Sequence, residues 1–244
     1  MCVSKIAMWS GPRYLSTAML YAFAQRPDCH VVDEPFYGAY LQASGADHPL
    51  RDQIIAAMET DAEIVAAQCS EAAPTEKPVF YQKHMTHHML PSFPLGWLSD
   101  VTNVFLIRHP ARVIASYSAK RDQPNLGDLG YVQQVQIYDR CLANGQDPVV
   151  IDADLFRDNP LEYIKKMCSK IGLDFTEKML TWPRGAKPYD GVWAKHWYGA
   201  VHESTGFAGP DGPLPNLADQ DLQRLANRAM PFYTRMRDRA LVID

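Results

Sequence analysis

The sequence lacks the features of membrane proteins and of disulfide-stabilised secreted proteins. No apolar stretch reaches the ~18 residues of a membrane span, and Ser4 and Lys5 interrupt the N-terminal apolar run, so no secretion signal is predicted. The five cysteines are odd in number and widely spread, with no Cys-x-x-Cys pair or zinc-ribbon spacing. This usage favours reduced thiols over a disulfide framework. We therefore expect a soluble cytoplasmic protein without a membrane partner.

Positive charge is also scarce. The chain carries 24 Lys and Arg against 28 Asp and Glu, a net charge of −4, which argues against a surface that coats nucleic acid and requires any basic site to be local. There is no internal repeat, heptad run or low-complexity tract. At 244 residues the chain can bury a sizeable core, and we predict a single domain over 1–244. The oligomeric state stays open, and a homodimer is compatible with the sequence.

Apolar runs alternate with helical patterns along the chain. This alternation predicts an α/β fold in which a parallel central sheet of about five strands is flanked by helices. The expected strands run from Lys5 to Ser10 and over 29–33, 78–84, 102–107 and 148–152. The expected helices run from Ser16 to near Arg26, over 49–59, 61–70, 131–144, 159–171 and 216–241 with a kink at Pro231, and two more lie before Asp100 and after Pro110.

Two segments do not fit this alternation. Residues 36–77 are polar and rich in alanine and are interpreted as an insertion, and residues 182–215 are rich in Gly, Pro and Trp and are interpreted as a loop. Parallel sheets of this class bind ligands at the carboxyl ends of their strands. We expect both segments to form lids over a ligand site there.

The turn after the first strand has the properties of an anion site. The strand stops at Ser10, and apolar residues then recur on one side of a helix over 15–23. Free N–H groups and the positive end of the helix dipole point out of such a turn. Arg13 adds a fixed charge, and the hydroxyls of Ser16 and Thr17 can donate to phosphate or sulfate oxygens. An ordinary strand-to-helix turn with a surface arginine is the alternative.

Polar residues gather after four of the predicted strands. A single histidine or arginine at a strand end is commonly a solvated or capping residue, but four neighbouring polar strand ends indicate a site. The residues are Arg13, Ser16 and Thr17 after the first strand, Glu34 after the second, Lys83, His84, His87 and His88 after the third, and Arg108 after the fourth.

These residues resemble the sulfotransferases that use 3′-phosphoadenosine-5′-phosphosulfate (PAPS). In that family a loop after the first strand holds the 5′-phosphosulfate, and 10–17 is similar to it, although larger residues replace two usually small ones. A second motif, Arg with Pro two residues later and Ser eight residues later, holds the 3′-phosphate, and 108–116 matches it. The implied donor site comprises Gly11, Pro12, Arg13, Tyr14, Leu15, Ser16, Thr17, Arg108 and Ser116. Arg184 is added because 184–187 weakly resembles the family's late phosphate loop.

Three further phrases, 33–37, 82–88 and 191–198, are similar to a bacterial branch of the superfamily and to sulfotransferase-like segments attached to branched-chain aminotransferase-like proteins. The resemblance implies the P-loop nucleotide-hydrolase-like architecture of sulfotransferases. It also implies PAPS as the donor co-substrate, a small-molecule acceptor with a hydroxyl or amine, and no need for a metal.

The resemblance further implies a general base after the second or third strand. His84 is our first candidate, because a histidine with a pKa of about 6.5 accepts a proton near neutral pH and His84 is nearest the strand end. Glu34 is the second, since an apolar wall would raise its pKa, and His87 is a further candidate. Lys83 is expected to stabilise the leaving phosphate oxygen, because its ammonium stays charged.

Three other functions stay open. A small-molecule kinase is disfavoured, because no Gly-x-x-x-x-Gly-Lys-Ser/Thr motif is present. A non-catalytic nucleotide-binding protein would explain Tyr14 and Leu15, the two larger residues in the first motif. A hydrolase with a metal held by His84, His87 and His88 is disfavoured, since side chains alternate between faces along a strand.

Overall fold

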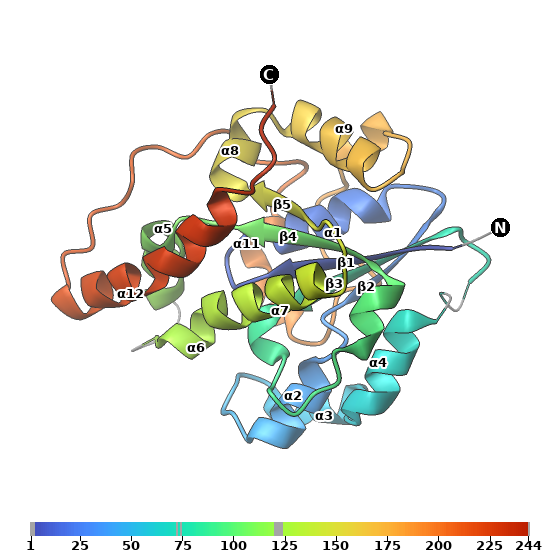
Figure 1. Ribbon diagram of the computed structural model, residues 1–244, viewed down its shortest axis with the longest axis horizontal. Coiled ribbons are helices and arrows are strands. Elements are labelled where there is room, and N and C mark those ends of the chain that lie inside the picture. Colours follow the sequence, from blue (N-terminus) through green and yellow to red (C-terminus); the bar gives the residue numbers. More distant parts are fainter. Residues whose placement is uncertain (1–2, 72, 74, 120–123, 244) are drawn as a thin grey trace.

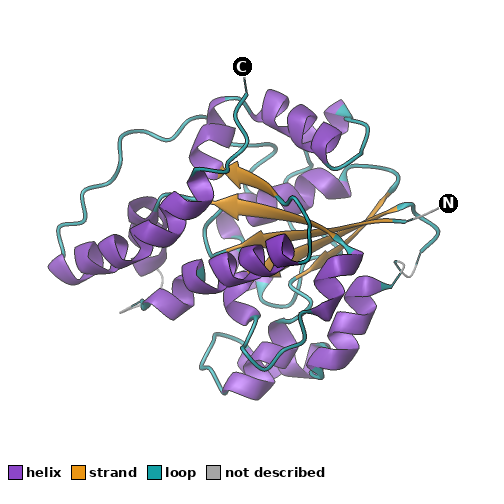
Figure 2. Ribbon diagram, viewed as in Figure 1, coloured by secondary structure: helices purple, strands orange, loops and turns teal. Residues whose placement is uncertain are grey.

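The computed structural model describes residues 3–71, 73, 75–119 and 124–243. Its centre is a sheet of five parallel strands in the order β2-β3-β1-β4-β5, so the first strand of the chain lies in the middle. The predicted α/β fold is confirmed (Figures 1 and 2). The strands are β1 (Ser4–Ser10), β2 (Cys29–Asp33), β3 (Val79–Met85), β4 (Thr102–Ile107) and β5 (Val149–Asp152).

Helices cover both faces of the sheet (Figure 2). The longer ones are α1 (Ser16–Ala24), α2 (Tyr37–Ser44), α3 (Arg51–Ala57), α4 (Ala62–Ser70), α5 (Pro110–Ser118), α7 (Tyr131–Ala143), α9 (Pro160–Lys170) and α12 (Gln220–Arg237). The shorter ones are α6 (Leu126–Leu129), α8 (Ala153–Asp158), α10 (Ala194–Trp197), α11 (Gly199–His202) and the 3₁₀ helices η1 (Thr86–His88), η2 (Gly96–Asp100) and η3 (Glu177–Leu180).

The alternation of side chains along the strands decides which residues meet which layer. On one face of the sheet Tyr81 of β3 stacks on Phe23 of α1, with ring centroids 4.2 Å apart. On the other face Trp9 of β1 packs against Trp97 of η2, and Phe105 of β4 against Tyr138 of α7. All seven residues of β3 are buried, including its Gln, Lys and His. The polar residues of this strand therefore need partners inside the protein.

Helix α1 is buried on every side, so the expected one-sided apolar stripe is wrong. Its residues from Ala18 to Phe23 are all buried. The outer side is covered because Trp182 packs edge-on against Tyr21, whose hydroxyl donates to Asp190. The segment after η3 thus forms a second layer over α1, which the local sequence pattern does not reveal.

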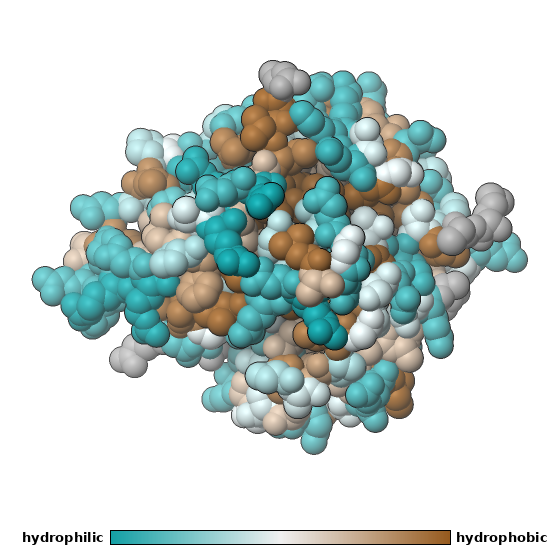
Figure 3. Space-filling view, viewed as in Figure 1, coloured by the Kyte–Doolittle hydropathy of each residue, from teal (hydrophilic) through white to brown (hydrophobic). Residues whose placement is uncertain are grey.

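Helix α12 is amphipathic and starts later than predicted. Its buried side is formed by Leu225, Ala226, Ala229, Tyr233 and Met236, and its outer side is hydrophilic at the left of Figure 3. The helix begins after Asp219, whose carboxylate accepts from two N–H groups of the first turn. It continues through Pro231.

Four further helices depart from the sequence interpretation. Helix α2 lies inside the segment 36–77 and helix α8 directly after β5, and neither was predicted. Helices α10 and α11 lie inside the segment 182–215, which is therefore not a loop throughout. Each is short, and an isolated helix of this length is unstable without tertiary contacts.

No helix in the part of the chain that the structure describes is both long and apolar enough to cross a membrane. The four cysteines within that part are free thiols. Cys2, the fifth, lies outside the described residues.

Candidate active site

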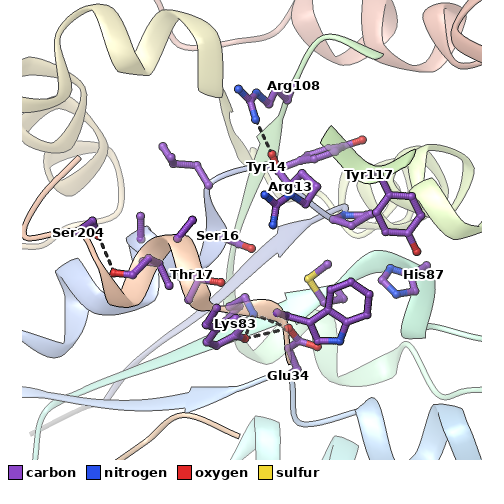
Figure 4. Close-up of a pocket in the computed structure, with 18 of the residues that line it drawn as sticks. Arg13, Tyr14, Ser16, Thr17, Glu34, Lys83, His87, Arg108, Tyr117 and Ser204 are labelled. Atoms are coloured by element: carbon purple, nitrogen blue, oxygen red, sulfur yellow. Dashed lines mark hydrogen bonds and ion pairs between the residues drawn. The ribbon is translucent and has the colours of Figure 1, made fainter. Parts of the chain in front are cut away.

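The carboxyl ends of the central strands open into a pocket of about 350 Å³. Figure 4 shows Arg13 and Arg108 on one side of it and Lys83 and Glu34 on the other. Side chains from the segments 36–77 and 182–215 complete the wall, among them Tyr37, His48, Trp197 and Tyr198. The pocket thus lies where ligands bind in parallel sheets.

The loop that joins β1 to α1 has a strained backbone. Arg13 and Leu15 have φ angles of 69° and 76°, in the left-handed region that disfavours residues with a Cβ. Leu15 is the N-cap residue of α1, and no side chain caps this helix. The N–H groups of the first turn and the positive end of the helix dipole therefore stay available at the wall lined by Ser16 and Thr17.

Gly11 is required by close packing beneath this loop. A Cβ built on Gly11 would lie 2.4 Å from the backbone oxygen of Leu129 and 2.7 Å from Cζ of Tyr14. The Tyr14 ring cannot move away easily, because it is fully buried and packs against Tyr131 at 5.4 Å. The large residue at position 14 is thus accommodated below the loop, at the expense of any side chain at position 11.

Gly11→Ala is therefore expected to lower the free energy of unfolding by roughly 1–3 kcal/mol, the usual range for overpacking. Urea denaturation followed by circular dichroism measures this change. The matched control is Gly96→Ala, because a Cβ at Gly96 meets no atom within 4 Å. Equal stability of the two variants would contradict the close packing at Gly11.

The two sequence motifs meet at one point of the pocket wall. The Nε atom of Arg13 donates to Oγ of Ser116 at 2.8 Å. Nη1 of Arg108 donates to the backbone oxygen of Arg13 at 2.9 Å (Figure 4). Burial and, after it, the charge of Arg108 lower the pKa of Arg13 from its ordinary value. Two guanidinium groups that are close together and partly desolvated favour an anion between them.

A buried ion-pair network forms the opposite side of the pocket. Nζ of Lys83 donates to Oδ1 of Asp33 at 2.8 Å, to Oε1 of Glu34 at 2.5 Å and to the hydroxyl of Tyr198 at 2.7 Å. Burial lowers the pKa of Lys83, but Asp33 and Glu34 together raise it above its ordinary value. Lys83 therefore stays charged.

The carboxyl group of Glu34 has a raised pKa. Burial is the largest cause, and the charge of Lys83 opposes it. Oε2 of Glu34 lies 3.9 Å from Nδ1 of His88. The backbone of Glu34 is also left-handed, with φ at 49°. Among the described residues, three of the four non-glycine residues with positive φ therefore line the pocket, and such strain is typical of functional sites.

His84 does not reach the pocket, so its assignment as the base is wrong. It points to the face of β3 opposite to Lys83, because neighbouring residues of a strand alternate. There its ring stacks on Trp9 at 4.5 Å and its Nε2 lies 3.1 Å from Oε1 of Gln82. Burial and, after it, the charge of Lys83 lower the pKa of His84 to about 3. His84 is thus a neutral residue of the core.

His87 and His88 follow β3 in the short helix η1, and both line the pocket. The ring of His88 stacks between Tyr37 and Tyr40, at 4.3 and 4.9 Å. The metal cluster that included His84 is not formed, since His84 lies on the other side of the sheet. Within the described part of the chain, no three His, Cys, Asp or Glu side chains are placed to hold a metal ion.

Arg184 also lies away from the pocket. Its side chain is 68 % exposed, and its nearest ion partner is Oε2 of Glu203 at 3.8 Å. Lys187 belongs to the same segment that resembles the family's late phosphate loop, and it donates to the backbone oxygens of Pro183 and Gly185. The structure therefore does not support the assignment of Arg184 to the donor site, because this side chain is exposed and does not line the pocket.

The sulfotransferase domain family matches residues 4–240, nearly the whole chain. The chain belongs to this family. Two relatives from Arabidopsis thaliana are branched-chain-amino-acid aminotransferase-like proteins 1 and 2, which are 37 % and 34 % identical to this sulfotransferase-family chain over 232 residues. That alignment covers 95 % of the chain but only 41 % of either relative. The chain therefore spans less than half the length of these relatives.

Solved sulfotransferases share the fold. A mouse sulfotransferase in complex with PAP has a TM-score of 0.57 at 11 % identity, over 95 % of this chain and 85 % of its own. A sulfotransferase from Alicyclobacillus acidocaldarius has a TM-score of 0.55 at 10 % identity, over 98 % of this chain and 96 % of its own. At such low identity the likeness concerns the fold alone. It agrees with the expected sulfotransferase architecture.

Most of the residues that the family resemblance selected come together. Gly11 and Ser116 lie behind the wall, in contact with the loop, and only His84 and Arg184 lie elsewhere. The selected residues that line the pocket are Pro12, Arg13, Tyr14, Leu15, Ser16, Thr17, Glu34, Lys83, His87 and Arg108.

Sequence reasoning missed Arg157, Asp33 and Tyr198. Arg157 lines the pocket from α8, a helix that was not predicted. Asp33 and Tyr198 bind Lys83. The only sequence indication of their role was that both lie in segments similar to the family, 33–37 and 191–198. No local pattern marks Arg157, because its approach to Arg108 depends on the pairing of β4 with β5.

Proposed function

We propose that the chain is a PAPS-dependent sulfotransferase that transfers a sulfuryl group to a hydroxyl or amine of a small-molecule acceptor. The observation that carries the proposal is the convergence of Arg13, Arg108, Ser16 and Thr17 on one pocket whose other side holds Glu34. Cationic and hydroxyl groups at one end suit an anionic donor, and a carboxylate with a raised pKa at the other suits proton removal. Membership of the sulfotransferase family favours this reaction over that of a kinase.

The residues of the pocket fit the two anionic ends of PAPS. The uncapped first turn of α1, with Arg13, Ser16 and Thr17, would hold the 5′-phosphosulfate. Arg108 would hold the 3′-phosphate, and Ser116 would orient Arg13 through its hydrogen bond. An anion would also relieve the repulsion between Arg13 and Arg108. PAPS, when bound, supplies the sulfuryl group.

Glu34 is the proposed general base, and His87 is the alternative on the same wall. In the reaction the acceptor oxygen or nitrogen forms a bond to sulfur, the bond from sulfur to the 5′-phosphate oxygen breaks, and the base takes the acceptor proton. Burial raises the pKa of Glu34, which makes its carboxylate a better base. Lys83 holds Glu34 in place, and its charge would stabilise the leaving phosphate oxygen.

The segments 36–77 and 182–215 are the proposed lids of the acceptor site. Tyr37 and His48 line the pocket from the first segment, and Trp197 and Tyr198 line it from the second. Because Tyr198 donates to Asp33 at 2.7 Å, the second segment is bound directly to the charged network around Lys83. An acceptor enclosed by these side chains would be shielded from water.

Arg13→Ala is expected to weaken the binding of PAP, the nucleotide that remains when PAPS has lost its sulfuryl group, and to lower turnover by ten- to a hundredfold. The effect on folding should be small. A charged hydrogen bond to an anion contributes roughly 1.5–3 kcal/mol, which corresponds to that range. Calorimetric titration with PAP and a turnover assay with PAPS on a broad acceptor panel measure both effects. Arg184→Ala is the matched control, because Arg184 is exposed and lies outside the pocket.

Unchanged affinity and rate in Arg13→Ala would refute the assignment of Arg13. No PAP binding by the unmodified protein would refute the donor, and with it the proposed function. PAP binding without turnover on any acceptor would support the second candidate, a non-catalytic nucleotide-binding protein.

A further inference from the structure

The segment 208–213 lies beside the arginines of the pocket without regular secondary structure. Nε of Arg157 donates to the backbone oxygen of Gly209 at 2.8 Å, and Nη2 of Arg112 donates to that of Gly212 at 2.5 Å. A Cβ at Gly209 or Gly212 would meet no atom within 4 Å, and most of the segment is exposed. The segment is thus attached mainly through guanidinium groups and hardly through apolar packing.

The centre of this attachment is the carboxylate of Asp211. Its Oδ2 accepts from Nη2 of Arg108 at 2.6 Å, and its Oδ1 pairs with Nη1 of Arg157. Partial burial by itself raises the pKa of Asp211. The hydrogen bond from Arg108 and the charges of Arg108, Arg157 and Arg112 together lower this pKa by more, so that the net shift is downward. Asp211 is therefore an anion that bridges two guanidinium groups, one oxygen to each.

Both of these guanidinium groups belong to the pocket. Arg108 and Arg157 line it, and Arg108 also donates to the backbone of the phosphosulfate loop at Arg13. A second carboxylate, that of Asp154, also pairs with Arg108, with its Oδ1 3.5 Å from Nε of Arg108. Asp154 is fixed in α8, whereas Asp211 stands on the loosely packed segment. Of the two carboxylates, Asp211 is the one that a ligand can displace.

A phosphate group is a stronger partner for two arginines than a carboxylate. It carries a charge of about −1.5 to −2 at neutral pH and three acceptor oxygens, against −1 and two oxygens for Asp211. We propose that Asp211 is an internal anion that occupies the 3′-phosphate position of the donor site, and that Arg157 is a second arginine of that position. This inference rests on the proposed function, because the donor supplies the phosphate that replaces Asp211.

Competition between Asp211 and the 3′-phosphate lowers the apparent affinity for the donor. The donor binds only when Asp211 has left Arg108 and Arg157, and the apparent affinity is reduced by the fraction of molecules in which they are available. If the carboxylate occupies them about nine-tenths of the time, the reduction is about tenfold. A nucleotide that lacks the 3′-phosphate does not compete with Asp211 and is not subject to this reduction.

The test compares PAP with AMP, which lacks the 3′-phosphate, by calorimetric titration of the full chain. Asp211→Asn is expected to bind PAP about tenfold more tightly than the unmodified protein and AMP with unchanged affinity. Arg157→Ala is expected to bind PAP at least tenfold more weakly, again with AMP unchanged. Glu203→Gln is the matched control, because it removes a carboxylate that is 76 % exposed and pairs with Arg184 outside the pocket.

The two proposals fail in different ways. If the unmodified protein prefers PAP to AMP but Asp211→Asn binds PAP no more tightly, the inference about Asp211 is wrong while the proposed function stands. If Arg157→Ala keeps the full preference for PAP, Arg157 does not hold the 3′-phosphate. If the unmodified protein does not bind PAP, the proposed function is wrong and the inference fails with it.

Discussion

Glu34→Gln is expected to lower turnover by roughly a hundredfold or more, while PAP binds with nearly the same affinity. General base catalysis commonly contributes factors of about 10² to 10⁴, and an amide of the same shape cannot accept the acceptor proton. The amide keeps an oxygen that can accept from Lys83, and Asp33 remains as its charged partner, so the network stays largely intact. Turnover at saturating PAPS is the decisive measurement.

The pH profile gives a second readout of the same assignment. Turnover should fall as the pH falls through the pKa of Glu34, which burial raises above its ordinary value. In Glu34→Gln this acidic limb should be absent. If Glu34→Gln keeps both rate and limb while His87→Asn loses them, the base is His87, which lines the same wall.

Acid should destabilise the protein through His84. The pKa of His84 in the folded protein is about 3, below its ordinary value of 6.5, because the ring is buried. A neutral His84 therefore contributes stability that is complete above pH 6.5 and is lost as the pH falls toward 3. At 1.36 kcal/mol per pKa unit the full contribution is about 5 kcal/mol. Urea denaturation at pH 7.0 and at about pH 4.5 should reveal a large part of it.

His84→Asn should reduce this acid sensitivity, because asparagine does not titrate. The variant should also keep the pH profile of turnover, since His84 lies outside the pocket. His88, whose pKa burial also lowers, accounts for part of the remaining sensitivity. His196→Asn, which removes an exposed histidine, is the matched control. An unchanged acid slope in His84→Asn would contradict the structural role.

The sequence by itself determined the parallel sheet and the positions of its strands. Two of the predicted strands, 29–33 and 102–107, match the structure residue for residue. Continuous apolar runs and abrupt stops at Gly and Pro define such strands locally, so they can be recognised without the fold. The residues of the proposed donor site, Arg184 excepted, could be selected for the same reason, because they lie in two short motifs next to strand ends.

Only the tertiary structure decided which polar side chain faces the pocket. Lys83 and His84 are neighbours in the sequence and look equally suitable, yet strand alternation sends one into the pocket and the other into the core. The direction of that alternation depends on which face of the sheet α1 covers. No pattern within β3 contains this information, because all of its residues are buried.

The tertiary structure likewise decided the partners of the arginines. Arg108, Arg157 and Asp211 are far apart in the chain, and they meet because β5 pairs with β4 and the segment 208–213 returns across the end of the sheet. Arg184 matched the family's phosphate loop only in its letters and lies outside the pocket. Strands and turns depend on neighbouring residues, so the sequence reveals them locally. Ion pairs between distant segments depend on how the elements pack, so they become visible only in the tertiary structure.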